Sequence, residues 1–78
     1  MGWVIVEFEE VREVFVNGVS HGDNIGDDGD YNILHVGEGL QTFTLGGTPN
    51  YKPAMQKAMV PVNTPLTALH VVFTKKSP

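Results

Sequence analysis

Short runs of alternating apolar and polar residues dominate this chain, and glycine, proline and asparagine separate them. In the first run, WVIVEF, the side chains of Val4 and Val6 point to one side of an extended chain and that of Ile5 points to the other. This period of two, together with the β-branched content, predicts a strand over residues 3–8. Similar signals predict further strands at residues 13–16, 31–36, 40–45, 55–60 and 68–74.

The sequence is compatible with two structures for the segment that follows the first strand. Apolar side chains three and four apart fit a short helix over residues 9–16, whereas the dense valines favour a turn and then a strand at 13–16. Directly after it, Asn17-Gly18 stands between apolar residues. This dipeptide adopts two positive φ angles readily, so it predicts a hairpin turn.

Turn signals also organise the second half of the chain. The predicted strands at 31–36 and 40–45 are expected to pair as a hairpin across the Gly-Glu-Gly segment between them. Residues 46–53 are expected to form a loop, because prolines and tandem glycines weaken a hydrogen-bonded ladder. Six or seven short strands, without an amphipathic helix longer than two turns, predict an all-β fold. We expect a small antiparallel β-sandwich that forms a single domain over residues 1–78.

Composition and charge narrow the classes of function. Nine acidic residues against five basic ones give a net charge of −4, which argues against a nucleic-acid partner. No apolar run approaches the ~18 residues of a membrane span, so no membrane insertion is expected. The chain has no cysteine, which excludes disulfides and thiol chemistry. The start lacks the features of a signal peptide and predicts a cytoplasmic protein for the sequence as given. An exported or envelope location stays open for a chain trimmed at its start.

The stretch HGDNIGDDGD, residues 21–30, concentrates four aspartates and three glycines. Carboxylate oxygens are the ligands that calcium prefers, but an EF-hand register fails. With Gly29 at the sixth position, the third is Gly26 and the twelfth is His35. A solvated loop is favoured, in which aspartates form Asx turns and glycines adopt positive φ. The candidate ligands of an irregular calcium site are Asp23, Asp27, Asp28 and Asp30.

Three histidines, His21, His35 and His70, raise the question of a zinc or catalytic site. Their separations of 14 and 35 residues give no local ligand spacing. Alternation places His35 on one face with Ile33, and His70 on one face with Val72, as expected for strand residues that lie at a rim or are half-buried. The serine beside His21 has no glycines of a nucleophile elbow around it. We therefore expect no catalytic residue, no cofactor and no enzyme activity.

Exposed aromatic side chains are the strongest candidates for contact with a partner, because such anchors concentrate binding energy. Tyr51 lies in a proline-bounded segment between Asn50 and Lys52 and is the first candidate. Trp3, expected on an edge strand near the N-terminus, is the second.

From Val14 onward, over about four fifths of the chain, the order of motifs resembles a PEGA domain, a small transthyretin-like β-sandwich module. The matching motifs, in chain order, are VFVNGVSHG, HVGEGLQTFTL, NYKPAMQKAMVPV and TPLTALHVVFTKK. They resemble the opening strand with its Asn-Gly turn, the glycine loop with an alternating strand, the aromatic-x-Pro element and the basic closing strand. The sequence departs from the family at DNIGDDGD, where relatives carry Thr-Pro, and at Asn50, where they carry glycine.

The resemblance implies a binding or scaffolding module, of a kind often found at bacterial envelopes, without a catalytic constellation. We expect a non-catalytic module whose partner is a protein or a second copy of the chain, with a carbohydrate surface as the less favoured partner. Unpaired edge strands of a small sandwich support this expectation, because they accept another strand. Two alternatives stay open: a calcium-dependent module that uses the acidic loop at residues 22–30, and a small phage or virion structural protein.

Overall fold

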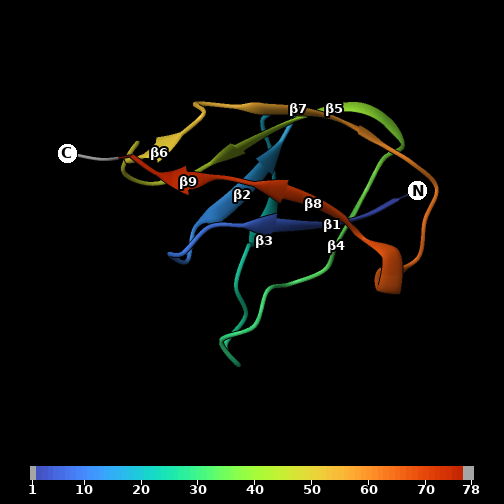
Figure 1. Cartoon of the computed structure of the whole chain (residues 1–78), viewed down its shortest axis with the longest axis horizontal. Coiled ribbons are helices and arrows are strands. Elements are labelled where there is room, and N and C mark those ends of the chain that lie inside the picture. Colours follow the sequence, from blue (N-terminus) through green and yellow to red (C-terminus); the bar gives the residue numbers. More distant parts are fainter. Residues whose placement is uncertain (1, 77–78) are drawn as a thin grey trace.

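A computed structural model describes residues 2–76, which form nine strands and one 3₁₀ turn. Their arrangement is shown in Figure 1. The elements in chain order are β1 (Gly2–Glu7), β2 (Glu13–Val16), β3 (Val19–Asp23), β4 (Leu34–Val36), β5 (Gly39–Leu45), β6 (Tyr51–Lys52), β7 (Gln56–Val60), η1 (Pro65–Thr67), β8 (Leu69–Val72) and β9 (Thr74–Lys75).

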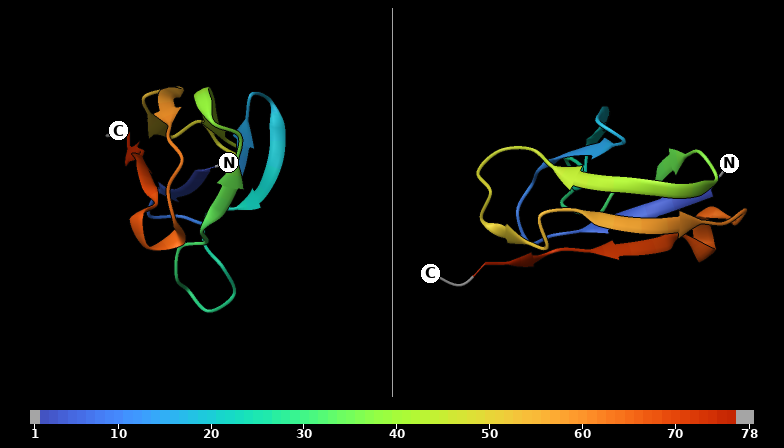
Figure 2. Two further views of the ribbon diagram at one scale, coloured as in Figure 1. Left: turned by 90° about the vertical axis from the view of Figure 1, so that its right-hand side faces the viewer. Right: turned by 90° about the horizontal axis from the view of Figure 1, so that it is seen from above.

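The strands form two main sheets that pack face to face (Figure 2). The three-stranded sheet has the order β4-β1-β8, the four-stranded sheet has the order β3-β2-β5-β7, and β6 pairs with β9 beyond them. The predicted all-β sandwich is therefore confirmed. One pair differs from the antiparallel expectation, because β1 and β8 run parallel.

The core lies between the two sheets and is built from the inward positions of the alternating strands. On β1 the buried positions are Gly2, Val4 and Val6, and on β5 they are Phe43 and Leu45. Burying these branched and aromatic side chains supplies the main drive for folding. The buried apolar residues are Val4, Val6, Phe8, Val14, Val16, Leu34, Val36, Phe43, Leu45, Val60, Val71 and Phe73.

The hairpin turn at Asn17-Gly18 is confirmed. The two residues have φ angles of 52° and 81°, and Val16 pairs with Val19 on either side of them. The strand expected at 13–16 is confirmed as β2, so the helical alternative for this segment is wrong.

The expected pairing of residues 31–36 with 40–45 is wrong. β4 pairs with β1, whereas β5 pairs with β2 and β7, so the two segments belong to different sheets. Leu34 and Phe43 both point into the core, which requires the strands to face each other across it. The short connection around Gly37 therefore carries the chain from one layer to the other.

Two further expectations need correction. Residues 46–53, expected to be loop throughout, contain β6, because Tyr51 and Lys52 pair with β9. Trp3 does not lie on an edge strand, because β1 is the central strand of its sheet.

A buried asparagine forms hydrogen bonds with backbone groups of residues 8–12, which connect β1 to β2 and which we call the crossing segment. The side chain of Asn24 is fully buried and accepts a hydrogen bond from the N–H of Arg12 at 2.7 Å. Its amide nitrogen donates to the carbonyl oxygens of Glu10 at 3.1 Å and Phe8 at 3.4 Å. Because a buried backbone group without a partner is costly, Asn24 fixes the path of this crossing segment.

Candidate functional site on the three-stranded sheet

The outer face of the three-stranded sheet is apolar at its centre. β1 places Trp3, Ile5 and Glu7 outward, each half-buried, while its other positions enter the core. A strand with apolar residues on both sides is typical of sheets that are covered on both faces. In the chain described here, the only cover on the outer side is what neighbouring side chains provide.

The two flanking strands extend this surface. Cross-strand register sets His35 of β4 opposite Trp3, and on β8 it sets His70 opposite Ile5 and Val72 opposite Glu7. Ile33 continues the alternation of His35 and is 44% exposed, and Val72 is 46% exposed. The expectation that the two histidines are strand residues is confirmed, and of the two positions left open for them, rim or half-buried, both are exposed. We call this surface the Trp3 face, and its residues are Trp3, Ile5, Glu7, Ile33, His35, His70 and Val72.

Trp3 is held by contacts on two sides. Its indole ring stacks on the imidazole of His35, with ring centroids 4.0 Å apart and an interplanar angle of 7°. Its backbone N–H donates to Oδ1 of Asn63 at 2.6 Å, and Nδ2 of Asn63 donates to its carbonyl oxygen at 3.1 Å. The side chain of Asn63 therefore makes the two hydrogen bonds with Trp3 that a residue of a neighbouring strand would make. This leaves a preorganised aromatic side chain whose ordering costs little when a partner binds.

One polar side-chain pair lies on the Trp3 face. Nδ1 of His70 and Oε2 of Glu7 are 2.6 Å apart, and both side chains are partly exposed. The pair orients the imidazole, as a carboxylate does in a catalytic dyad, but no pocket is found among residues 2–76. The geometry is that of a flat surface with one polar contact.

The four aspartates considered as calcium ligands lie on or beside a short hairpin, which we call the acidic arm (residues 24–32). Ile25 and Tyr31 form an isolated bridge, and the N–H of Gly26 donates to the carbonyl oxygen of Asp30 at 2.8 Å. Gly29 has a φ of 85°, and Oδ1 of Asp28 accepts the N–H of Asp30 at 3.0 Å. The predicted Asx turn and positive φ are confirmed, and together they close the hairpin tip.

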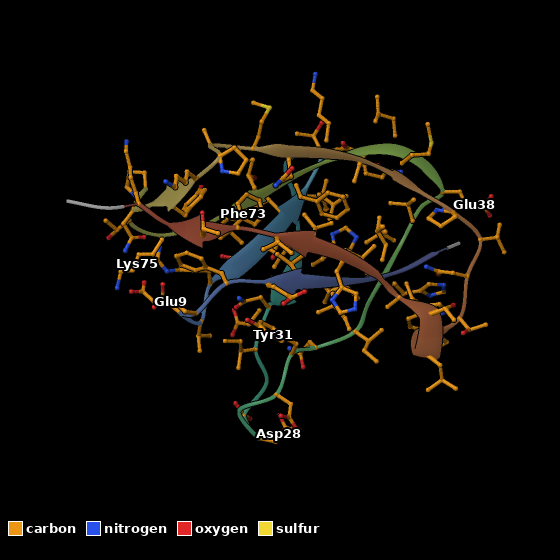
Figure 3. All side chains as sticks on the ribbon, in the orientation of Figure 1. Glu9, Asp28, Tyr31, Glu38, Phe73 and Lys75 are labelled. Carbon is orange, nitrogen blue, oxygen red and sulfur yellow. The ribbon has the colours of Figure 1, made fainter. Side chains whose placement is uncertain are left out.

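The acidic arm projects from the sandwich with Asp28 near its tip (Figure 3). Its base is fixed to the crossing segment, because the hydroxyl of Tyr31 donates to the carbonyl oxygen of Phe8 at 3.2 Å. Asp23 lies outside the arm, at the end of β3. No group of three or more histidine, aspartate or glutamate side chains within residues 2–76 is placed to hold a metal ion.

The three histidines are not brought together. His21 lies on β3 in the four-stranded sheet, where its Nδ1 is 3.1 Å from the carbonyl oxygen of Val19. His35 and His70 share the Trp3 face but lie on opposite sides of β1, each opposite a different residue.

Tyr51 does not have the exposed position expected of it. Its ring is half-buried and meets the rings of Phe8 and Phe73 edge-on, with centroids 5.9 Å and 5.5 Å away. Its hydroxyl donates to the carbonyl oxygen of Leu45 at 2.7 Å. These contacts make Tyr51 part of the packing at the end of the core. Trp3 is also half-buried, but its ring contact is with the exposed His35, so it becomes the first aromatic candidate for a partner.

A compact ionic network connects three segments that are distant from one another in the sequence. Glu10 forms an ion pair with Arg12 and accepts a hydrogen bond from Nζ of Lys75 at 2.9 Å. These contacts lower the pKa of Glu10 from 4.5 to about 2, and the contact with Lys75 has the largest effect. The Arg12 guanidinium also donates to the carbonyl oxygen of Thr48 at 2.7 Å and to Oδ1 of Asn50 at 2.9 Å. The network ties the crossing segment to β9 and to the loop before β6, which indicates a structural role.

Comparison with known proteins finds no matching family model, no curated protein with significant similarity and no solved structure with significant similarity. The resemblance to PEGA domains therefore stays a prediction. No helix within residues 2–76 is long and apolar enough to cross a membrane. Fold and surface together define a small all-β sandwich with a partly exposed apolar sheet face.

Proposed function

We propose that this chain is a non-catalytic binding or assembly module and that it binds a protein partner on the Trp3 face. The observation that carries the proposal is a half-buried apolar stripe on a central strand that has the pattern of a strand buried on both faces, flanked by Ile33 and Val72, which are 44% and 46% exposed. Contiguous exposed apolar surface of this kind marks interaction sites in small soluble proteins.

The composition of the face supports a protein partner. Interface centres are enriched in aromatic residues and depleted of charge. The Trp3 face includes the one tryptophan of the chain, and its one carboxylate, Glu7, is already paired with His70. One side of the indole is occupied by His35, which leaves less open ring surface for a sugar and so favours protein over carbohydrate.

Paired lysine substitutions test the proposal. Val72→Lys places a charge on the Trp3 face, and Leu40→Lys places one on the outer face of the four-stranded sheet, where Leu40 is 62% exposed. Both sites are solvent-accessible, so both variants should fold with melting temperatures near that of the wild type. Affinity capture from the cells of origin should give a bound protein that Leu40→Lys retains and Val72→Lys loses. Equal retention by both variants would contradict the assigned face.

A further inference from the structure

We infer that Asn17 is a site of spontaneous deamidation, and that this modification weakens the pairing of β2 with β3. Asn17 is exposed and is followed by Gly18. Each of the other four asparagines is followed by a residue with a bulky side chain, namely Ile25, Ile33, Tyr51 or Thr64. Because glycine has no side chain, its backbone nitrogen is unobstructed, and the Asn-Gly pair is where such a nitrogen most readily reaches a side-chain amide.

The reaction uses only the chain and water. The backbone nitrogen of Gly18 loses its proton and attacks Cγ of Asn17, so an N–Cγ bond forms, the Cγ–Nδ2 bond breaks, and Nδ2 leaves as ammonia with that proton. The product is a succinimide ring. Water then adds to one of the ring carbonyl carbons and breaks its bond to nitrogen. Attack at Cγ gives aspartate, whereas attack at the main-chain carbon gives isoaspartate, in which the chain runs through Cβ and Cγ.

The folded protein restrains this reaction, because β5 holds both polar atoms of the Asn17 amide. Oδ1 accepts a hydrogen bond from the N–H of Thr42 at 2.9 Å, and Nδ2 donates one to Oε1 of Gln41. Gln41 is itself anchored, since its Nε2 donates to the carbonyl oxygens of Gly37 and Glu38 at 3.0 Å and 3.1 Å. The amide must leave these partners before Cγ can meet the following backbone nitrogen. The reaction therefore proceeds through local opening of the turn.

Both products weaken the turn. In aspartate a carboxylate replaces the amide, so Oε1 of Gln41 loses its donor and faces a negatively charged acceptor. Isoaspartate adds one methylene to the backbone of a turn whose two residues have φ angles of 52° and 81° and which sets the pairing of Val16 with Val19. Because the length of a turn fixes the register of its hairpin, the added backbone atom disrupts this pairing.

β3 can separate from β2 at little cost to the core. β3 is an edge strand of its sheet, and its five residues are exposed or half-buried. The buried side chains of β2, Val14 and Val16, keep their pairing with β5. The fully buried Asn24 holds the chain directly after β3. Deamidation therefore leaves the sandwich folded and uncovers backbone groups at the edge of β2.

Mass spectrometry of the full chain tests the site. The protein is incubated in mildly alkaline buffer, either folded or unfolded in urea, and fragmentation locates the exchange of amide nitrogen for oxygen. We expect Asn17 to convert ahead of every other asparagine in both conditions. Conversion should be at least about tenfold slower in the folded protein, because the hydrogen bonds of the turn must open first. Earlier conversion at another asparagine, or equal rates in folded and unfolded protein, would overturn the inference.

Two glutamine substitutions test the restraint. Gln41→Ala removes the acceptor of Nδ2 and should raise the rate at Asn17 in the folded protein by about 2- to 10-fold. The rate in urea should not change, because only the folded chain has this contact. Gln56→Ala is the matched control, since Gln56 is also half-buried and its Nε2 donates to the carbonyl oxygen of Val72 at 2.9 Å, on the far side of β5 from the turn.

The control should leave the rate at Asn17 unchanged. If both variants accelerated the reaction equally, the rate would follow overall stability and the assigned restraint would be refuted. If Asn17 stayed unmodified in folded wild type and folded Gln41→Ala alike, it would not be a modification site of the folded protein.

Hydrogen exchange tests the effect on the sheet. The isoaspartate form, isolated by chromatography, should lose protection at the amide protons that join β3 to β2, whereas β1 and β5 keep theirs. Asn17→Asp carries the charge without the added methylene and should show a smaller loss. Unchanged protection between β2 and β3, or loss of protection in every strand, would contradict a local disruption of the hairpin.

Discussion

Replacing Asn24 with alanine should destabilise this protein more than any other single polar truncation outside its apolar core. The side chain is fully buried, and it makes one hydrogen bond to the N–H of Arg12 and two to carbonyl oxygens of the crossing segment. Alanine removes all three bonds and leaves the backbone groups in place. The loss should therefore reflect the cost of buried groups without partners.

The size of the loss in unfolding free energy depends on which backbone groups have no other hydrogen-bond partner once the Asn24 side chain is removed. The carbonyl oxygen of Phe8 keeps the hydrogen bond from the hydroxyl of Tyr31 at 3.2 Å. The N–H of Arg12 and the carbonyl oxygen of Glu10 lose the partner that Asn24 gave them. Both of these bonds are only part-buried, so each group should cost an amount near the lower end of about 1–3 kcal/mol, and the free energy of unfolding should fall by about 2 kcal/mol. A chain of 78 residues has a total stability of roughly 4–12 kcal/mol, so the loss is a large share of it.

Urea unfolding at pH 7, followed by circular dichroism and Trp3 fluorescence, measures this loss. The matched control is Asn32→Ala, at the other end of the acidic arm, where one bond from Nδ2 to the carbonyl oxygen of Asp23 at 2.9 Å is lost at a half-exposed site. The control should lose about 1 kcal/mol or less. If both variants lose the same free energy with unchanged denaturant slopes, the reasoning from buried unpaired groups is refuted.

Three further predictions concern packing, pH and calcium. Gly2→Ala would place Cβ 2.3 Å from Cγ1 of Val60, so we expect a loss of about 1–3 kcal/mol in the same urea assay, whereas Gly37→Ala, with its nearest contact at 3.3 Å, should cost much less. The pKa of Glu10 is lowered to about 2, chiefly by Lys75, so the ionised carboxylate stabilises the fold above pH 4.5, and this contribution disappears as the pH falls from 4.5 to 2. Glu10→Gln should therefore flatten the plot of unfolding free energy against pH in that range. An unchanged plot would contradict the stabilising role of the Glu10–Lys75 pair. The acidic arm closes through its own hydrogen bonds, so adding calcium and then a chelator should leave the melting temperature unchanged, and a clear rise with calcium would support the calcium-dependent alternative.

Local patterns predicted most of the strands because alternation depends only on neighbouring residues. The period of two in Val4 and Val6, and again in Phe43 and Leu45, follows from a pleated chain that buries one side. The Asn17-Gly18 turn was predictable for a similar reason, because φ preferences are properties of the residues themselves.

Strand pairing was less predictable, because a turn signal does not reveal the layer to which the chain returns. The Gly-Glu-Gly segment after β4 is compatible with a hairpin in one sheet and with a crossing between two sheets. Alternation places Leu34 and Phe43 on inward faces in both cases, and the register that decides between them involves β1, about thirty residues earlier in the chain. The same distance in sequence hid the short pairing of Tyr51 with Lys75.

The candidate site shows the same division between local and distant information. The alternation around His35 and His70 correctly indicated strand positions, but it left open whether the two side chains are half-buried or exposed. The sequence contains no local signal that both flank β1, nor that the His35 ring lies on Trp3, because those relations come from two separate strand registers. The continuous apolar run of β1 is the available local signal for a strand with two covered faces.

Asn24 and Tyr31 link the stability of the sandwich to the geometry of its proposed interface. Both side chains bind the crossing segment after β1, and both lie in the acidic arm. The direction in which the arm leaves the sandwich is therefore fixed by contacts with the core of the same sheet that presents Trp3. A mobile acidic loop would spread its charge over many positions, whereas a fixed arm presents its aspartates at a constant distance from the apolar face. This fixed relation explains why a solvated hairpin tip is built on a fully buried asparagine.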